Sequence, residues 1–121
     1  MKDNTGSGGE QYAARYLEKK GYRILARNYR SRFGEIDLIA ANSRYLVFAE
    51  VKTRRKGSMT GPLESVTAAK QRRLIRTALM YLRSFPSALQ PRFDVIGLTV
   101  KDGSAVSVEH IENAFDCGGF F

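Results

Sequence analysis

The chain has little that could form a disulfide or a zinc site. Its 121 residues include one cysteine, Cys117, and one histidine, His110. A single cysteine excludes an internal disulfide, and the two residues together exclude a zinc finger or a similar Cys/His zinc site. A catalytic metal ion would therefore have carboxylate ligands, which favours the hard cations Mg²⁺ and Mn²⁺.

Long hydrophobic runs are also missing. No window of the sequence has the continuous apolar character of a membrane-spanning helix, and the N-terminal segment lacks the apolar core of a signal peptide. We therefore expect a soluble, cytoplasmic protein without a membrane partner. A chain of this length can close one hydrophobic core without disulfide or metal cross-links, so we expect a single domain.

Negative charge is scarce relative to positive charge. The chain has 20 Lys and Arg residues against 12 Asp and Glu residues, which gives a formal net charge of +8. An excess of this size on a small protein predicts a polyanionic partner, and nucleic acid is the commonest one.

The N-terminal half predicts one helix followed by three strands. Residues 1–9 are polar and glycine-rich, so we expect a disordered lead-in before a domain over residues 10–116 and a tail over 117–121. Apolar residues recur at helical spacing from 11 to 20, and Gly21 stands where a helix commonly ends. The segments rich in strand-forming residues are 22–29, 35–41 and 45–53, the last two forming a hairpin.

The C-terminal half predicts a long helix and two further strands. Residues 67–85 carry an apolar stripe formed by Leu74, Ile75, Ala78, Leu82 and Phe85. Residues 93–100 and 105–111 have strand character, and a short helix is expected over 112–115. This order of elements predicts an α/β fold with a central mixed five-stranded sheet flanked by helices.

The segment Tyr45-Leu46-Val47-Phe48-Ala49-Glu50-Val51-Lys52 is the most informative in the sequence. Side chains alternate faces along a strand, so Glu50 and Lys52 share a face with two bulky apolar residues. Asp37 lies on the preceding predicted strand. A hairpin loop with an even number of residues would place it on the same face as Glu50.

Two converging carboxylates beside a lysine suit metal-assisted phosphodiester hydrolysis. The carboxylates of Asp37 and Glu50 would hold the cation, and Lys52 would orient water or stabilise the transition state. The alternative is an ordinary charged strand end, because such spacings arise often by chance. The predicted hairpin, the apolar face and the adjoining Arg54-Arg55-Lys56 favour the metal site.

Other residues are secondary candidates. Glu10 opens the first predicted helix, where a carboxylate complements the helix dipole. Gln71 falls on the apolar stripe of the long helix, so it could reach the site or a phosphate. The basic residues of that helix, Lys70 and Arg73 among them, either form a solvated face or contact phosphates together with Arg54, Arg55 and Lys56.

Several further residues have two interpretations. For Asp94 beside Arg92 we expect a structural ion pair, and for His110 a structural or exposed position rather than general-base catalysis. Aromatic residues lie among arginines near the start of the predicted sheet, which suits stacking on unpaired strands but is also ordinary for core residues. These aromatic residues are Tyr22, Tyr29 and Phe33.

At this point the sequence resembles the YraN-like proteins, a family of uncharacterised small bacterial proteins related to restriction endonucleases and archaeal Holliday-junction resolvases. The resemblance extends over nearly everything from Gly9 to Phe115. Its blocks are Gly9-Glu10, Gly34-Glu35-Ile36-Asp37-Leu38-Ile39, Val47-Phe48-Ala49-Glu50-Val51-Lys52-Thr53-Arg54, Lys70 with Arg73-Leu74, Arg92-Phe93-Asp94-Val95, and Asn113-Ala114-Phe115.

The resemblance implies a restriction-endonuclease-like fold. It places Asp37, Glu50 and Lys52 at the acid, acid and lysine positions of that superfamily, and Glu10 at the first-helix glutamate of the resolvases. The leading hypothesis is a Mg²⁺- or Mn²⁺-dependent endonuclease acting on DNA, including branched or distorted DNA. The alternatives are a non-catalytic nucleic-acid-binding accessory module and an RNA-directed or ribosome-associated role. A homodimer would suit paired incisions, with the apolar residues of the C-terminal tail at its interface.

Overall fold

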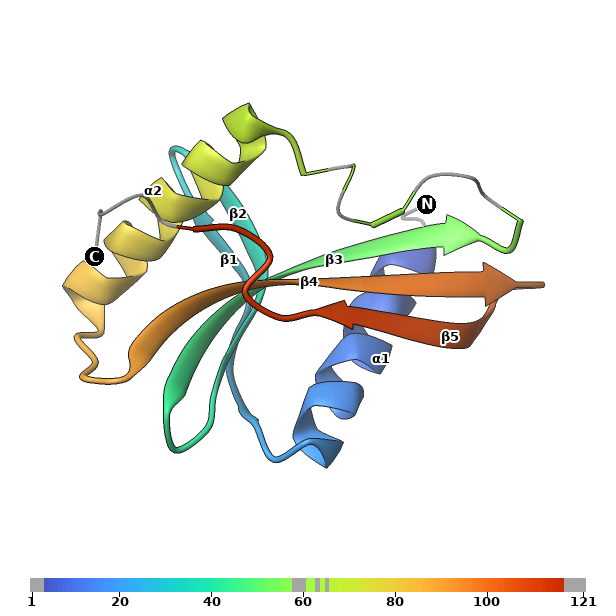
Figure 1. The fold of residues 1–121 in the computed structure, drawn as a ribbon, viewed down its shortest axis with the longest axis horizontal. Coiled ribbons are helices and arrows are strands. Elements are labelled where there is room, and N and C mark those ends of the chain that lie inside the picture. The colour runs from blue at the N-terminus through green and yellow to red at the C-terminus, as the bar shows by residue number, and fades with distance from the viewer. Residues whose placement is uncertain (1–3, 58–60, 63, 65, 117–121) are drawn as a thin grey trace.

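The computed structural model describes residues 4–57, 61–62, 64 and 66–116. Within them the chain forms two helices and five strands (Figure 1). The elements are α1 (Asn4–Lys19), β1 (Arg23–Ser31), β2 (Gly34–Ala41), β3 (Tyr45–Arg55), α2 (Ala68–Ser84), β4 (Gln90–Lys101) and β5 (Ser104–Ile111).

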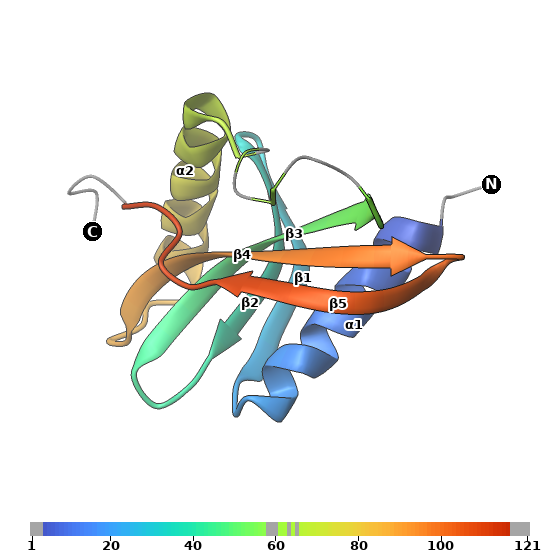
Figure 2. The ribbon, with the colours of Figure 1, turned by 45° about the vertical axis from the view of Figure 1, so that its right-hand side comes forward.

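The five strands form one mixed sheet in the order β1-β2-β3-β4-β5. Strands β3 and β4 are parallel, whereas the other neighbours are antiparallel. A parallel pair needs a long crossover, and helix α2 lies in that connection. The two helices pack against opposite faces of the sheet (Figure 2). The expected α/β fold, with a central mixed five-stranded sheet flanked by helices, is confirmed.

Each face of the sheet has its own hydrophobic core. On the α2 face, Phe48 and Phe93 stack at a centroid distance of 5.4 Å beneath Leu74 and Ala78. The core of the α1 face consists of Ala13, Ala14, Leu17, Tyr22, Leu38, Ala40, Val47, Ala49, Ile96 and Leu98. The alternation of side chains along β3 contributes to both cores, so this strand is buried on two sides.

Helix α2 begins after Thr67, whose side chain accepts a hydrogen bond from the backbone N–H of Lys70. The predicted stripe is buried at Leu74, Ile75 and Ala78. The prediction that the stripe extends to Phe85 is wrong, because the helix ends at Ser84 and Phe85 is 55% exposed.

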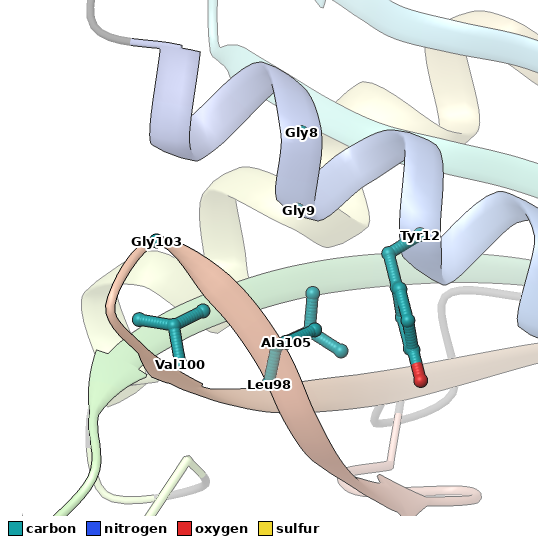
Figure 3. A pocket seen from close by; sticks show the side chains of 7 residues that line it. All are labelled: Gly8, Gly9, Tyr12, Leu98, Val100, Gly103 and Ala105. Atoms are coloured by element: carbon teal, nitrogen blue, oxygen red, sulfur yellow. The ribbon is translucent and has the colours of Figure 1, made fainter.

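Helix α1 begins at Asn4, so the expected disordered lead-in over residues 1–9 is wrong for residues 4–9. Within this segment, Gly9 lets the helix approach β3 closely. A Cβ atom at Gly9 would lie 2.6 Å from Oγ1 of Thr53. Figure 3 shows this stretch of α1 over Leu98, Val100 and Ala105, around a small pocket of about 120 Å³.

The expected short helix over residues 112–115 is also wrong. Asn113 has a positive φ of 52°, which interrupts helical geometry, and its backbone N–H donates to Oδ1 of Asp94. Phe115 then stacks on Phe93 at 5.0 Å. The predicted tail over 117–121 lies outside the described residues, as does Cys117. No helix within the described ranges is long and apolar enough to cross a membrane.

Candidate functional site

The register of the β2–β3 hairpin brings Asp37 to Glu50. The pairing runs from Ala41↔Leu46 to Leu38↔Ala49, so Asp37 and Glu50 are the residues that directly follow the last pair on the two strands. The pair next to the turn, Ala41↔Leu46, encloses residues 42–45, an even number, as the sequence-based hypothesis required. On β3, Glu50 and Lys52 alternate with the residues of the α1-side core, so they lie on the α2 face.

The backbone is irregular where Asp37 leaves the strand ladder. On the neighbouring strand, Asn28 has a φ of 51°, and on β2 both Ile36 and Ile39 join the core of the α2 face although they are three residues apart. Regular alternation is therefore broken between them. Instead of a backbone carbonyl, Oδ2 of Asp37 accepts the N–H of Val51 at 2.7 Å. This bond holds the carboxylate at the strand edge.

Glu50 is a buried carboxylate with a cationic partner. The residue is 6% exposed, and its Oε2 lies 2.5 Å from Nζ of Lys70. Lys70 stands in the first turn of α2, whose start is capped by Thr67. A charge removed from water is costly unless it is paired, so this ion pair offsets the burial of Glu50.

Burial and neighbouring carboxylates act on Asp37. Burial raises the pKa of Asp37 to about 7, and the charge of Glu50 adds to this effect. Glu10 and Glu35 raise the pKa further, whereas the hydrogen bond from Val51 lowers it. Glu10, half-buried in α1, therefore acts electrostatically on the same carboxylate.

The two lysines of the site differ in their surroundings. Burial lowers the pKa of Lys52, the charge of Lys70 lowers it further, and the opposing effects of Glu50 and Asp37 are smaller. Burial also lowers the pKa of Lys70, but the hydrogen bond and charge of Glu50 outweigh it and leave the pKa raised. Lys52 is thus the lysine that more readily releases a proton.

A pocket opens over this cluster between β2, β3 and α2. Its volume is about 240 Å³. Its lining residues are Gly34, Glu35, Asp37, Glu50, Lys70, Arg73 and Leu74. Carboxylates from two strands and cations from α2 therefore border one hollow, which could admit an anionic ligand together with a cation.

Gln71 and the basic residues at the end of β3 are not among the residues that line this pocket. Gln71 donates from Nε2 to the carbonyl of Val66 at 3.1 Å. Arg54 lies 4.0 Å from Glu109, whereas Arg55 and Lys56 are exposed at the end of β3. The sequence-based hypothesis did not include the pairing of Lys70 with Glu50. The position of Lys70 one turn before Leu74 could have indicated it, because both then face the sheet.

The opposite face of the sheet holds a separate polar network. Asp94 accepts two hydrogen bonds from Arg92, at 2.9 and 2.8 Å, and its Oδ2 lies 2.7 Å from Nε2 of His110. Nδ1 of His110 lies 3.4 Å from the ammonium of Lys20, which only donates, so Nε2 carries the proton given to Asp94. The expected Arg92–Asp94 ion pair is confirmed, and His110 has a structural role.

The donor set suits a hard cation in part. Asp37 and Glu50 offer carboxylate oxygens, and Glu10 adds a third negative charge nearby. Across the described ranges, no group of three or more His, Cys, Asp or Glu side chains is close enough to form a metal cluster. A cation here would need water or phosphate oxygens as further ligands, which is typical of Mg²⁺.

Comparisons with known proteins identify the family. A UPF0102 protein of Pelobacter propionicus is 48% identical over 116 residues, covering 93% of this chain and 83% of the relative. A UPF0102 protein of Symbiobacterium thermophilum is 50% identical over 116 residues, covering 95% of this chain and 98% of the relative.

Among solved structures, SfsA of Pyrococcus furiosus in complex with Ca²⁺ aligns with a TM-score of 0.37 and 15% identity, covering 89% of this chain and 62% of that protein. The chain therefore spans less than two thirds of SfsA. A family model for the uncharacterised protein family UPF0102 matches residues 9–98. The chain belongs to this family, and the resemblance to YraN-like proteins is thereby confirmed.

Proposed function

We propose that the protein is a metal-dependent endonuclease that hydrolyses phosphodiester bonds in DNA, with Asp37, Glu50 and Lys52 at its active site. The observation that supports this most is that Asp37 and Glu50 line one pocket, on the face of β3 that also carries Lys52. The pKa of Asp37, raised by burial and by the charge of Glu50, is typical of a carboxyl group in a functional site.

Asp37 and Glu50 would hold Mg²⁺ or Mn²⁺, with Glu10 as an additional acidic group. Asp37 uses Oδ2 for Val51 and keeps its second oxygen available within the part of the chain that the structure describes. When bound, a divalent cation supplies water activation and neutralisation of phosphate charge. Binding near Glu50 requires the ammonium of Lys70 to move aside, toward a phosphate for example, because both cations would use the same carboxylate.

Lys52 would act on the reacting phosphate. Its ammonium would stabilise the negative charge that develops in the transition state. Because its pKa is lowered, it would also give a proton to the leaving oxygen more readily than an exposed lysine. Arg73, at the rim of the pocket, would contact a neighbouring phosphate and position the strand.

A non-catalytic nucleic-acid-binding module is the second candidate. The Lys70–Glu50 ion pair favours it, because an ammonium 2.5 Å from the carboxylate already neutralises one of the acids that a metal would need. The formal charge of +8 would support binding to nucleic acid in either case.

Cleavage of defined substrates separates the two candidates. Labelled single-stranded, duplex, flap and four-way-junction DNA would be incubated with the protein and Mg²⁺ or Mn²⁺, with an RNA strand in parallel. Asp37→Asn is the control, because it keeps the acceptor for Val51 but removes the charge. Cleavage by the wild type that is lost in Asp37→Asn supports the enzyme. Tight binding without cleavage supports the module.

A further inference from the structure

A second hollow lies beside the candidate active site, between the β1–β2 turn and α2. Its volume is about 450 Å³, within the range of small-ligand pockets. The lining residues are Arg32, Phe33, Arg76, Leu79, Met80 and Arg83. We call this hollow the Phe33 groove.

The groove combines an apolar floor with a basic rim. Phe33, Leu79 and Met80 are half-buried, so part of their apolar surface stays accessible. The four α2 residues of the groove are spaced three, four and seven apart and therefore form one face of the helix, next to its core-facing stripe. Arg76 and Arg83 on this face are exposed.

The charges around the groove are of one sign. The guanidinium groups of Arg32 and Arg76 lie 5.0 and 5.7 Å from the centre of the Phe33 ring. Within the described residues, the ion pairs do not include Arg32, Arg76 or Arg83. Two arginines at the ring and a third in the same groove concentrate positive charge, which a polyanion would offset.

The groove continues the surface of the carboxylate pocket. Phe33 in the groove is followed by Gly34 in the pocket, and Arg73 in the pocket is followed one helical turn later by Arg76 in the groove. At Gly34 the two walls are close, since a Cβ atom there would lie 3.5 Å from Cβ of Arg73. A strand bound at Asp37 and Glu50 would pass directly into the groove.

We propose that the Phe33 groove binds an unpaired base of single-stranded DNA, stacked on Phe33, with the arginines on the flanking phosphates. Stacking needs an exposed base face, which a paired base inside a duplex does not offer. The choice of occupant follows from the charge and the aromatic ring together, because an apolar protein segment would leave the arginines unpaired. This inference rests on the proposed function and adds a substrate class: DNA with an unpaired stretch beside the scissile bond.

Binding without divalent metal tests this proposal independently of cleavage. Fluorescence anisotropy in EDTA would compare a short single strand with a duplex of the same sequence, for the wild type and Phe33→Leu. Leucine keeps apolar volume but removes the stacking surface, so affinity for the single strand should fall about five-fold or more, while duplex affinity changes less than two-fold. Phe85→Leu is the matched control, because Phe85 is an exposed aromatic residue outside the groove.

The salt dependence of single-strand binding tests the arginines of the Phe33 groove. Arg76→Gln and Arg83→Gln should each flatten the logarithmic dependence of single-strand affinity on salt concentration by about 0.7, the value for one phosphate contact. Arg44→Gln, an exposed arginine in the β2–β3 turn, should change the slope less. Thermal unfolding would establish that each variant is folded before binding is compared.

The outcomes distinguish this proposal from the nuclease hypothesis. If Phe33→Leu binds single strands as Phe85→Leu does, the groove proposal fails even where the wild type cleaves DNA. If Phe33→Leu selectively loses single-strand binding and the wild type cleaves nothing, the groove proposal holds and the nuclease hypothesis fails. If Phe33→Leu instead abolishes self-association in sedimentation without affecting DNA binding, the groove is a dimer surface and the proposal is overturned.

Discussion

The ammonium nitrogen of Lys70 lies 2.5 Å from Oε2 of Glu50, the carboxylate that lines the same pocket as Asp37. Lys70 is therefore an internal cation at the place where the proposed function needs a metal ion. If Lys70 and the metal compete for Glu50, removing the lysine should have opposite effects on the stability of the metal-free protein and on metal affinity.

Lys70→Ala should destabilise the metal-free protein by about 1–3 kcal/mol, because Glu50 stays buried without a partner. Mg²⁺ should then restore stability by binding the vacated carboxylate. Thermal unfolding over a Mg²⁺ series would measure both effects. Arg72→Ala, on the exposed side of the same helical turn, is the control. An equal Mg²⁺ dependence in Lys70→Ala and the wild type would contradict competition for Glu50.

Asp37 should make the metal-free protein less stable as the pH rises. Its pKa is about 7 in the folded protein against an ordinary 3.8, so the folded state holds the proton more tightly. The contribution of this proton to the free energy of unfolding is fully present below pH 3.8, and it is lost as the pH rises through about 7.

Asp37→Asn should consequently be more stable than the wild type near pH 8, by on the order of 2 kcal/mol, with the difference shrinking toward pH 4. Urea unfolding in EDTA across this range would measure it. Asp102→Asn in the exposed β4–β5 turn serves as the comparison. A constant difference between Asp37→Asn and the wild type at every pH would argue against the raised pKa.

Lys52→Ala should separate chemistry from binding. If Lys52 acts on the reacting phosphate, cleavage should fall about 100-fold or more while DNA affinity stays nearly unchanged. Metal affinity should remain equal or rise slightly, because removing a cation leaves the carboxylates more negative, whereas Asp37→Asn should weaken it. Calorimetry with Mn²⁺ would compare the two variants. A parallel loss of DNA binding and cleavage in Lys52→Ala would assign the lysine to binding alone.

The end of β3 should contribute to nucleic-acid binding through exposed charge. Arg55→Ala and Lys56→Ala should each flatten the salt dependence of duplex affinity by about 0.9, through loss of one phosphate contact. Arg54→Ala should have a smaller effect, because this arginine already lies 4.0 Å from Glu109. Anisotropy at several salt concentrations provides the slopes. Three unchanged slopes would exclude this segment from the binding surface.

The Asp94 network should matter for stability and not for metal binding. Asp94→Asn removes the carboxylate that accepts from Arg92 and His110 and leaves Arg92 only its longer contact with Glu112, which should cost about 3 kcal/mol near neutral pH. Burial raises the pKa of Asp94, but the hydrogen bonds from His110, Arg92 and Asn113 outweigh it and leave the pKa lowered. The stability it contributes is thus present above pH 3.8 and lost as the pH falls through the lower folded value.

The difference between Asp94→Asn and the wild type should therefore narrow in acid, as urea unfolding would measure. Mn²⁺ affinity of the variant should stay that of the wild type, because the network and the carboxylate pocket lie on opposite faces of the sheet. If Asp94→Asn has the stability of the wild type but no longer binds Mn²⁺, the network would be part of the metal site and this prediction would be wrong.

Much of the architecture is readable from local patterns. The period of two along β3 places Glu50 and Lys52 on one face, and the hairpin brings Asp37 to the same pocket as Glu50. Helical spacing predicts the core positions of α2 at Leu74 and Ala78. These features depend on residues close in sequence, whose relative directions follow from backbone geometry alone.

Other features depend on how distant segments pack. The pairing of Lys70 with Glu50 arises because α2 crosses over the sheet, and the Phe33 groove arises where the β1–β2 turn meets that helix. Of the three aromatic residues predicted for either stacking or the core, Tyr22 and Tyr29 pack into cores and only Phe33 lines the groove. The close approach of α1 to β3 at Gly9 likewise joins segments far apart in the sequence. Spacing along the chain determines which way each side chain points. The crossover and the sheet register determine which distant side chains come within bonding distance.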